Sequence, residues 1–261
     1  MASLLTSLDT RGVATLILNR PEVHNAFDDA VIGDLNDALA MYARHPDVRL
    51  LVLRAEGKSF SAGADLGWMK RMASSSREDN LADALELERL MRGLYEFPRP
   101  SIAVVQGAAY GGAVGLVSCC DLAIASEQAS FALSEVKLGL APAVISPFVI
   151  AAIGARQASR YFLTAERFSA ATARELGLVH EVVTPEALEA AQAKMIDTLL
   201  ANGPVALMAA KALLRKAAAA SSPELAAYTT ELIASLRTSQ EGQEGLGAFF
   251  EKRQPAWQKK N

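Results

Sequence analysis

The sequence predicts an α/β fold with a largely parallel sheet, followed by a helical region. Three observations lead to this prediction. Short apolar segments rich in β-branched residues alternate with longer segments of helical periodicity, which is the pattern of βαβ units. Aromatic residues are only 6% of the 261 residues, and the 51% hydrophobic content is carried by Ala, Leu and Val, which favours helices packed closely on strands. From about Leu188 onward, Ala-, Leu- and Lys-rich segments follow one another.

Four segments predict strands because they are short, apolar and bounded by turn residues. The first ends at Asn19, shortly before Pro21. The continuous apolar run at residues 50–53 is typical of a strand that is buried on both faces of a sheet. The predicted strands are residues 13–19, 50–53, 102–105 and 122–125.

Helical periodicity lies between these strands. Asp28 can cap a helix in which apolar residues recur at helical spacing, and Pro46 lies beyond its end. A later helix is stopped by Pro98 and Pro100. The predicted helices of this part are residues 28–42, 81–95 and 113–120.

The last quarter of the chain predicts consecutive helices. Pro204 and Pro223 mark two of their starts. We therefore divide the chain near residue 195 into an α/β core, residues 1–195, and a helical region, residues 196–261. Each amphipathic helix needs an apolar partner, either on its own core or on another subunit. The predicted helices are near residues 188–200, 205–219, 223–238 and 244–252.

Charge and cysteine usage limit the classes of partner and compartment. Lys+Arg 26 against Asp+Glu 29 gives a net charge of −3, which disfavours nucleic acid as a partner. Cys119 and Cys120 are adjacent and the three histidines are scattered, so we predict free thiols and no metal site. The chain shows no signal-peptide pattern, and no apolar run approaches the roughly 20 residues of a membrane span. We expect a soluble protein of a reducing compartment, the cytoplasm.

Two loops rich in small residues are candidates for a ligand site. FSAGAD at residues 60–65 follows a predicted strand, and GAAYGG at residues 107–112 lies between a strand and a helix start. Glycine allows close backbone approach, and a helix N-terminus offers unpaired N–H groups. Two such amides can form an oxyanion hole for a carbonyl that gains negative charge. Ordinary tight turns have the same composition, and the second loop lacks the glycine spacing of nucleotide-binding motifs.

Seven motifs, in order along the chain, resemble the enoyl-CoA hydratase/isomerase (crotonase) family. The resemblance runs from about Val13 to Trp257. It implies a crotonase-like ββα spiral core with a C-terminal helical oligomerisation region, an acyl-CoA substrate, and no cofactor besides the coenzyme A of that substrate. The motifs are LILNRPEVHNAF, FSAGADL, QGAAYGGAVGL, CDLAIAS, FALSEVKLGLAP, LTAERFSAATARELGLV and AFFEKRQPAW.

The resemblance implies a catalytic site on the two loops already singled out. The backbone amides of Ala64 and Gly112 would hold the thioester oxygen. Glu135, in the motif SEVKLG, would be the acid–base residue. Without the resemblance, an exposed carboxylate or a helix cap is the ordinary role for Glu135. The apolar residues next to it in the sequence favour a raised pKa.

The resemblance also implies residues that bind the acyl-CoA. Ala62, Asp65 and Leu66 would line its path. Phe249 and Lys252 would reach the nucleotide end of coenzyme A, often from a neighbouring subunit. The family assembles as trimers or dimers of trimers, so a homotrimer or dimer of trimers is expected.

One catalytic position departs from the family's two-carboxylate hydratases. Their first Glu lies three residues after the oxyanion glycine, and this chain has Gly115 there. The segments GGAVGLVSCCD and LSEVKLGLAPAVISPF resemble bacterial hydratases of 3-methylglutaconyl-CoA or isohexenylglutaconyl-CoA. Such substrates carry a distal carboxylate. We therefore hypothesise that the space at Gly115 receives that carboxylate or its ordered water.

The leading hypothesis is a lyase that hydrates an α,β-unsaturated acyl-CoA, with a branched glutaconyl-CoA as substrate. The single Glu leaves a Δ3,Δ2-enoyl-CoA isomerase open, because one carboxylate can move a proton between two carbons. A catalytically inactive acyl-CoA binder and an RNA binder are further alternatives. The helix at residues 28–42 carries no Lys or Arg, which disfavours RNA.

For several other side chains the sequence allows more than one role. Trp68 and Met69 either line an acyl pocket or belong to the core. Lys70, Arg71 and Arg92 are candidates to pair with a distal substrate carboxylate, and their spacing favours none of them.

Overall fold

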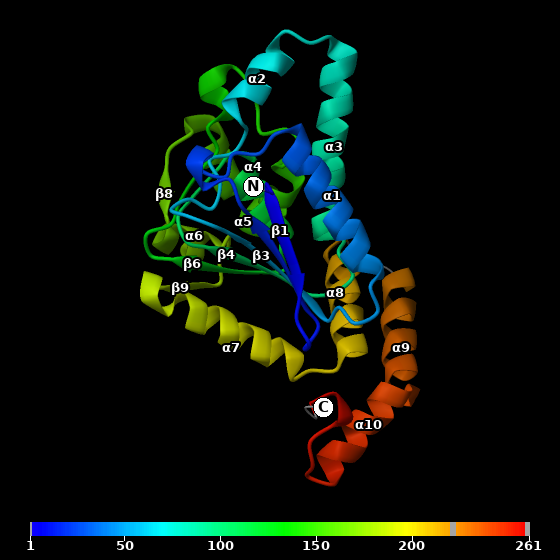
Figure 1. Cartoon of the computed structure of the whole chain (residues 1–261). Coiled ribbons are helices and arrows are strands. Elements are labelled where there is room, and N and C mark those ends of the chain that lie inside the picture. Colours follow the sequence, from blue (N-terminus) through cyan, green and yellow to red (C-terminus); the bar gives the residue numbers. More distant parts are fainter. Residues whose placement is uncertain (1, 220–222, 259–261) are drawn as a thin grey trace.

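Two sheets form the framework of the chain, for which a computed structural model describes residues 2–219 and 223–258 (Figure 1). The larger sheet has the strand order β1-β2-β3-β4-β6-β9, and the smaller has the order β5-β7-β8. The β1–β2 and β7–β8 pairs are antiparallel, and the other neighbours are parallel. The strands are β1 Leu4–Leu8, β2 Val13–Leu18, β3 Leu50–Ala55, β4 Ser101–Val105, β5 Ala108–Tyr110, β6 Leu122–Ser126, β7 Ser130–Ala132, β8 Phe168–Ser169 and β9 Glu181–Val183.

Helices cover both faces of the larger sheet (Figure 1). Buried residues of α1, α3, α4 and α5 form one core with one face, and α7 packs on the other. The helices are α1 Asp29–Arg44, α2 Leu66–Ala73, α3 Arg77–Tyr95, α4 Gly112–Cys119, α5 Ser146–Thr164, α6 Ala170–Leu176, α7 Leu188–Leu200, α8 Pro204–Ala219, α9 Pro223–Thr238 and α10 Gln240–Phe250. Short 3-10 turns are η1 Pro21–Val23, η2 Glu135–Leu138, η3 Pro185–Ala187 and η4 Ala256–Gln258.

Strand β3 divides its side chains between the two cores. Leu51 and Leu53 face the core under α1 and α3, whereas Leu50 and Val52 face α7. All four are at most 1% exposed. Alternate residues of a strand point to opposite faces, so a continuous apolar run is stable only where both faces are covered. The prediction of a doubly buried strand at residues 50–53 is confirmed.

The predicted alternation of strands and helices in the first half is confirmed, with shifts at the element ends. The helix expected over residues 81–95 begins earlier, at Arg77. Ser76 and Asp79 form a capping box: Asp79 N donates to Ser76 Oγ at 3.1 Å, and Ser76 N donates to Asp79 Oδ2 at 3.3 Å. This pair satisfies amides of the first turn and sets the start of α3.

Two expectations need correction. The segment at residues 107–112 is more than a glycine-rich turn, because Ala108–Tyr110 forms strand β5 beside β7. The helix predicted near residues 244–252 ends at Phe250, and Lys252 lies outside it with a φ of +53°. Strand β1, helix α2 and the elements between β6 and α7 were not predicted from the sequence.

Free thiols were predicted at both cysteines, and both are free in the structure. Cys119 is buried against Met91, whose Sδ accepts from its Sγ at 3.9 Å. Burial raises the pKa of Cys120 to about 12. A thiol that stays protonated is a poor nucleophile and metal ligand.

An ion pair between the buried Lys211 and the partly exposed Asp121 anchors α8 to the core. Lys211 is 6% exposed, and its Nζ lies 2.5 Å from Asp121 Oδ2 and donates to Arg99 O at 2.8 Å. Asp121 Oδ2 also accepts from Ser101 N at 2.8 Å and Ser101 Oγ at 2.9 Å. The start of the helical region is therefore tied to the beginning of β4.

Arg49 and Glu241 connect the C-terminal helices to one another and to β3. Arg49, just before β3, donates to Leu200 O at 3.0 Å and Asn202 O at 3.2 Å. Glu241 of α10 accepts the free amides at the start of α8, Val205 N at 2.9 Å and Ala206 N at 2.8 Å. Acceptors at a helix N-terminus satisfy amides that have no intrahelical partner.

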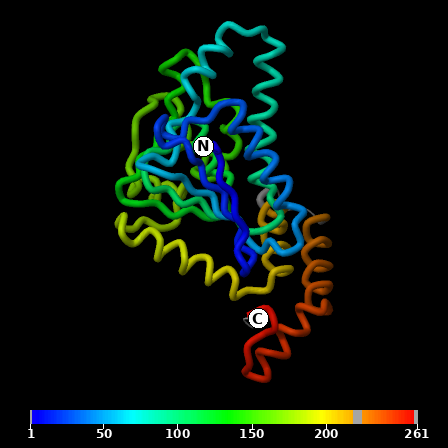
Figure 2. Tube along the Cα trace, viewed as in Figure 1, coloured from blue at the N-terminus to red at the C-terminus, as the bar shows by residue number. Residues whose placement is uncertain are grey.

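Helices α9 and α10 extend away from the sheets, at the end of the molecule opposite α2 (Figures 1 and 2). Their large apolar residues stay exposed in the single chain: Ile233 by 53%, Phe249 by 76% and Phe250 by 74%. The division of the chain near residue 195 stays a prediction.

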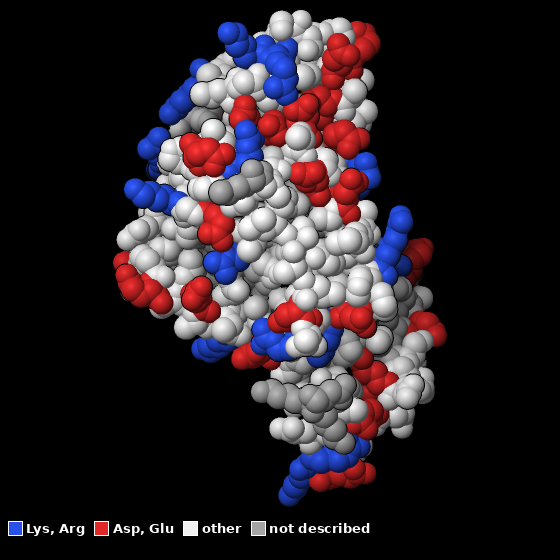
Figure 3. Space-filling view, viewed as in Figure 1, with Lys and Arg blue, Asp and Glu red and all other residues white. Residues whose placement is uncertain are grey.

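No helix in the described part of the chain is long and apolar enough to cross a membrane. On the face drawn in Figure 3, acidic side chains gather toward α1 and α3, while Lys and Arg are scattered along the opposite edge.

Replacing Lys211 tests the anchor of α8. Lys211→Ala should lower the free energy of unfolding by about 1–2 kcal/mol, because it removes the ion pair with Asp121 and the hydrogen bond to Arg99 O. The Asp121 carboxylate is partly exposed and keeps its hydrogen bonds from Ser101, so the loss stays below that of a fully buried pair. Urea unfolding at neutral pH measures the change. Lys194→Ala, at an exposed position of α7, is the matched control and should change it by less than about 0.5 kcal/mol. Equal losses in the two variants would contradict an anchoring role.

Candidate functional site

The loop at residues 59–65 is held by two residues in left-handed backbone conformations. His24 and Asn25 have φ values of +54° and +53°. The buried Asn25 side chain donates from Nδ2 to Glu56 O at 2.7 Å and Ser59 O at 2.8 Å. His24 O accepts from Ala62 N at 2.9 Å. Asn tolerates this conformation better than most residues. The side-chain amide of Asn25 supplies the hydrogen bonds that hold this segment in place.

The two glycine-containing loops lie directly against each other. Ser61 N donates to Ala108 O at 3.0 Å, and Tyr110 N donates to Ser61 O at 3.0 Å, as in a parallel strand pair. A Cβ on Gly63, where φ is +89°, would lie 2.8 Å from Tyr110 O. Position 63 therefore requires glycine for both its conformation and the closeness of the second loop.

Phe27 contacts both loops at the two predicted oxyanion donors. Phe27 N donates to Gly63 O at 2.9 Å, and Asp65 N donates to Phe27 O at 3.0 Å. This pairing uses the groups on either side of Ala64 and leaves the Ala64 N–H on the opposite edge of the segment. The Phe27 ring meanwhile lies against Gly112, where a Cβ would be only 2.6 Å from Cζ.

Gly112 is the first residue of α4, so its N–H has no intrahelical acceptor. The preceding Gly111, with φ of +54°, donates its own N–H to Ala132 O at 2.8 Å. The helix N-terminus also carries roughly half a positive charge. The structure therefore brings the loops that carry the Ala64 and Gly112 amides together around one aromatic ring.

Strand pairing brings Glu135 to the same place. Strands β5 and β7 are parallel, with Tyr110 opposite Ala132, so the residues that follow them meet at one sheet edge. A Cβ on Gly111 would lie 3.3 Å from Glu135 Oε1. Glu135 is thus next to the start of α4 rather than facing bulk solvent.

The environment of Glu135 favours its neutral form. Its Oε2 is buried and has no hydrogen-bond partner among the described residues. Burial raises the pKa of the Glu135 carboxyl above its ordinary 4.5. A desolvated carboxyl beside unpaired amide groups is suited to taking up and returning a proton.

The hypothesis for Gly115 is wrong in one respect, because no open space exists there. A Cβ on Gly115 would lie 2.4 Å from Ile145 Cγ2, 2.8 Å from Ile145 Cβ and 3.2 Å from Met91 Sδ. Ile145 is 2% exposed and Met91 is fully buried. Apolar side chains therefore fill the volume in which we expected a substrate carboxylate or water.

The residues expected to line the acyl-CoA path differ in role. Leu66 is 82% exposed and Ala62 is also exposed, so both lie on the open side of the first loop. The Asp65 carboxylate is occupied: Oδ1 accepts from Gly67 N at 2.8 Å and Trp68 N at 3.2 Å, and Oδ2 accepts from Arg20 Nη2 at 3.0 Å. Asp65 therefore caps α2 and orients the loop.

Trp68, which the sequence placed either in an acyl pocket or in the core, belongs to the core. It is 7% exposed, and its Nε1 donates to Asp83 Oδ1 at 2.9 Å. Arg71 pairs with Asp29 at 2.6 Å, and Arg92 pairs with Glu88 and Glu96. Lys70 is exposed on α2.

Within one chain, Phe249 and Lys252 do not join this site. Phe249 lies in the last turn of α10 and Lys252 just beyond that helix, which is on the opposite side of the molecule from α2 (Figures 1 and 2).

Sequence analysis missed three residues that build the site: Arg20, Phe27 and Ile145. Arg20 connects the caps of two helices, donating to Asp28 Oδ2 at 3.1 Å and to Asp65 Oδ2. Arg20 and Phe27 lie in LILNRPEVHNAF, a motif noted only for its resemblance. An Arg and a Phe flanking a polar turn could have been weighed as candidates, whereas nothing in the sequence connects Ile145 to Gly115.

Replacing Asp65 tests its capping role through pH. The hydrogen bond from Trp68 N, followed by those from Gly67 and Arg20, holds the pKa of Asp65 below its ordinary 3.8. Its stabilisation is therefore present above pH 3.8 and is lost as the pH falls through the lower folded-state value. Asp65→Ala should lose about 1–2 kcal/mol of unfolding free energy at neutral pH.

Urea unfolding from pH 7 down to pH 2 measures this difference, which should shrink only at the acidic end. Asp37→Ala, at an exposed position of α1, is the control and should show little difference at any pH. A loss for Asp65→Ala that is independent of pH would contradict the ionised cap.

Comparisons with known proteins agree with this geometry. A family model described as "Enoyl-CoA hydratase/isomerase" matches residues 9–260. The crystal structure of an enoyl-CoA hydratase from Shewanella pealeana has 50% sequence identity and a TM-score of 0.94, covering 98% of this chain and 96% of that chain.

Relatives of the chain include a hydratase and an isomerase. A "Putative enoyl-CoA hydratase" from Thermus thermophilus is 35% identical over 93% of this chain and 96% of its own length. A "Trans-2-decenoyl-[acyl-carrier-protein] isomerase" from Streptococcus mutans is 32% identical over 94% of each chain. The crotonase-type fold expected from the sequence is thereby confirmed.

Proposed function

The chain belongs to the enoyl-CoA hydratase/isomerase family, and on this premise we propose that it hydrates an α,β-unsaturated acyl-CoA thioester. The observation that carries the proposal is the buried Oε2 of Glu135, which has no hydrogen-bond partner among the described residues, beside the N-terminus of α4. A buried acid without a partner is costly to maintain, and it is useful where a proton must be transferred.

In the proposed mechanism, the amides of Ala64 and Gly112 donate to the thioester oxygen. That oxygen gains negative charge as an enolate forms, so the two hydrogen bonds strengthen in the transition state. Losing one donor of this kind costs on the order of 3 kcal/mol in activation free energy.

Glu135 acts in the proposed mechanism as both base and acid. Its carboxylate takes one proton from water while the water oxygen bonds to the β-carbon, and the carbonyl oxygen becomes the enolate oxygen. Glu135 then returns the proton to the α-carbon, and the double bond is consumed. A carboxyl with a raised pKa serves both steps, because it holds the proton long enough to deliver it.

The proposed substrate is 3-methylglutaconyl-CoA or a related branched glutaconyl-CoA. The resemblance of GGAVGLVSCCD and LSEVKLGLAPAVISPF to hydratases of such substrates supports this choice, together with Gly115 at the first acid position. Since Ile145 fills the space at Gly115, the distal carboxylate of the substrate would lie elsewhere. Lys70, exposed on α2 five residues after Asp65, is the basic candidate for which no ion pair is recorded among the described residues.

The second candidate is a Δ3,Δ2-enoyl-CoA isomerase. The single acid favours it, because one carboxyl can move a proton between two carbons without any bound water. The similarity to the isomerase from Streptococcus mutans also supports this activity. Ultraviolet absorbance of the conjugated thioester separates the two, since it falls on hydration and rises on isomerisation into conjugation.

We also propose a homotrimer or dimer of trimers. The exposed apolar residues of α9 and α10 supply a surface for other copies, and Phe249 and Lys252 would then reach the coenzyme A of a neighbouring subunit. An RNA-binding role is disfavoured by the mixture of both charge signs on the face shown in Figure 3.

Glu135→Gln tests the acid–base assignment. Turnover of the proposed acyl-CoA should fall by a factor of about 100 or more, because the amide cannot exchange the proton. The ultraviolet absorbance of the conjugated thioester, followed over time, measures the rate. Binding of a non-reactive acyl-CoA checks that the site is intact. Glu127→Gln, at an exposed position on the β6–β7 turn, should keep full activity. Unchanged turnover in Glu135→Gln would leave only an acyl-CoA binder.

The pH dependence of kcat/KM tests the same residue. Hydration begins with the carboxylate form, so activity should fall on the acidic side through a pKa above 4.5. Rates at saturating and limiting acyl-CoA across pH 4 to 8 measure the profile. An acidic limb at or below the ordinary value would contradict a desolvated base.

A panel of acyl-CoA substrates tests the substrate class. We expect 3-methylglutaconyl-CoA to be hydrated at least about tenfold faster than crotonyl-CoA, because only the former carries a distal acid. Product analysis by mass spectrometry identifies the hydrated thioester. Equal rates for the two would argue against a glutaconyl substrate while leaving the hydratase activity in place.

A further inference from the structure

We propose that Ile145 is a specificity-determining residue: its side chain occupies the volume that an acid at position 115 would need, and so commits the site to one acid. This inference rests on the proposed function and deepens it. Gly115 alone explains why a second carboxylate is absent, whereas Ile145 explains why none can be accommodated.

The steric observation is direct. A Cβ on Gly115 would meet Ile145 Cγ2 at 2.4 Å and Ile145 Cβ at 2.8 Å, both well inside van der Waals contact. Any side chain at position 115 therefore requires movement of Ile145. Met91 closes a further side, with its Sδ at 3.2 Å.

Ile145 has little freedom to move. It is the N-cap residue of α5, and its carbonyl accepts from Phe148 N at 3.1 Å and Val149 N at 3.0 Å. It is 2% exposed, and a β-branched side chain has few rotamers available. One of the two clashing atoms is Cβ itself, which no rotation can displace.

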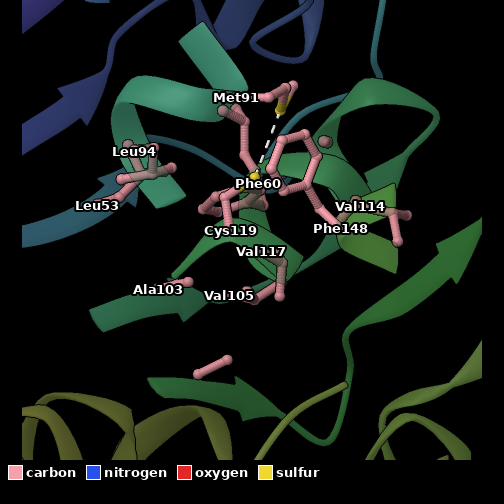
Figure 4. Close-up of a cluster of buried hydrophobic side chains, with 14 of the residues drawn as sticks. Leu53, Phe60, Met91, Leu94, Ala103, Val105, Val114, Val117, Cys119 and Phe148 are labelled. Carbon is pink, nitrogen blue, oxygen red and sulfur yellow. Dashed lines mark hydrogen bonds between the residues drawn. The ribbon is translucent and has the colours of Figure 1, made fainter. Parts of the chain in front are cut away.

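The two side chains nearest to a Cβ at position 115, Ile145 and Met91, are both apolar. Figure 4 shows Met91, Val114, Cys119 and Phe148 in one buried cluster, with the Cys119–Met91 contact marked. Such a cluster neither hydrates a carboxylate nor supplies it with a cation. An acid placed here would need both space and a path to water.

Position 115 lies next to the acid that is present. Gly111 is the N-cap residue of α4 and Gly115 lies four residues further on, so both are at the N-terminal end of this helix. Glu135 Oε1 lies over Gly111, and Ile145 lies over Gly115. Ile145 thus forms an apolar wall one helical turn from Glu135, where a second carboxylate would otherwise hold water.

The experiment combines substitutions at the two positions. Gly115→Glu alone should be inactive or poorly folded. Ile145→Gly removes both clashing atoms and leaves a residue that N-caps accept, whereas Ile145→Val keeps both atoms and is the matched control. In the double variant G115E/I145G, hydration of crotonyl-CoA should exceed that of G115E by about tenfold or more, and G115E/I145V should show no gain.

A stability cycle keeps the test decisive if the double variant does not fold. Gly115→Ala should lower Tm by several degrees in the native background and by much less in an Ile145→Gly background. Additive Tm changes, or a fully active G115E single variant, would overturn the assignment of Ile145.

The native protein separates this inference from the proposed function. If native protein hydrates neither 3-methylglutaconyl-CoA nor crotonyl-CoA, the proposed hydratase fails, and the Tm cycle still reports whether positions 115 and 145 compete for one space. If native turnover is present and G115E/I145G gains nothing over G115E, the function stands and the role of Ile145 is refuted.

Discussion

Phe27 joins the two loops on which the whole site depends. Its backbone pairs with the groups on both sides of Ala64, and its ring lies against Gly112. It is 1% exposed, so a shift of either loop would open a cavity in the core as well as break backbone pairing. The relative position of the two amides is therefore maintained by core packing, and polar interactions such as the Asp65 cap refine it.

The smaller sheet adds the acid to this arrangement. Parallel pairing of β5 with β7 places Glu135 beside the first turn of α4, where its buried Oε2 has no hydrogen-bond partner among the described residues. Near the same helix end, Ile145 occupies the space that a side chain at position 115 would need, and we propose that it excludes a second carboxylate there. The site consequently combines strong donors at one end with a single desolvated acid and an apolar wall. Such a site suits enolate chemistry in which one group both takes and returns the proton.

Local patterns were sufficient to predict much of the framework. The apolar run at residues 50–53 required burial on both faces, and the spacing of apolar residues after Asp28 required a helix. The two loops were identified by composition alone, before any family resemblance entered. The hypothesis for Gly115 went wrong because glycine was equated with empty space. Whether a missing side chain leaves room depends on its neighbours, and here the neighbour is 30 residues away in sequence.

By itself the sequence determined the alternation of strands and helices and the two small-residue loops. Each of these depends on residues close together in the chain. Only the tertiary structure decided that Phe27 connects the loops, that Asp65 is used as a helix cap, and that Ile145 fills the space beside Gly115. Contacts of this kind form between segments distant in sequence, and close packing in three dimensions selects them.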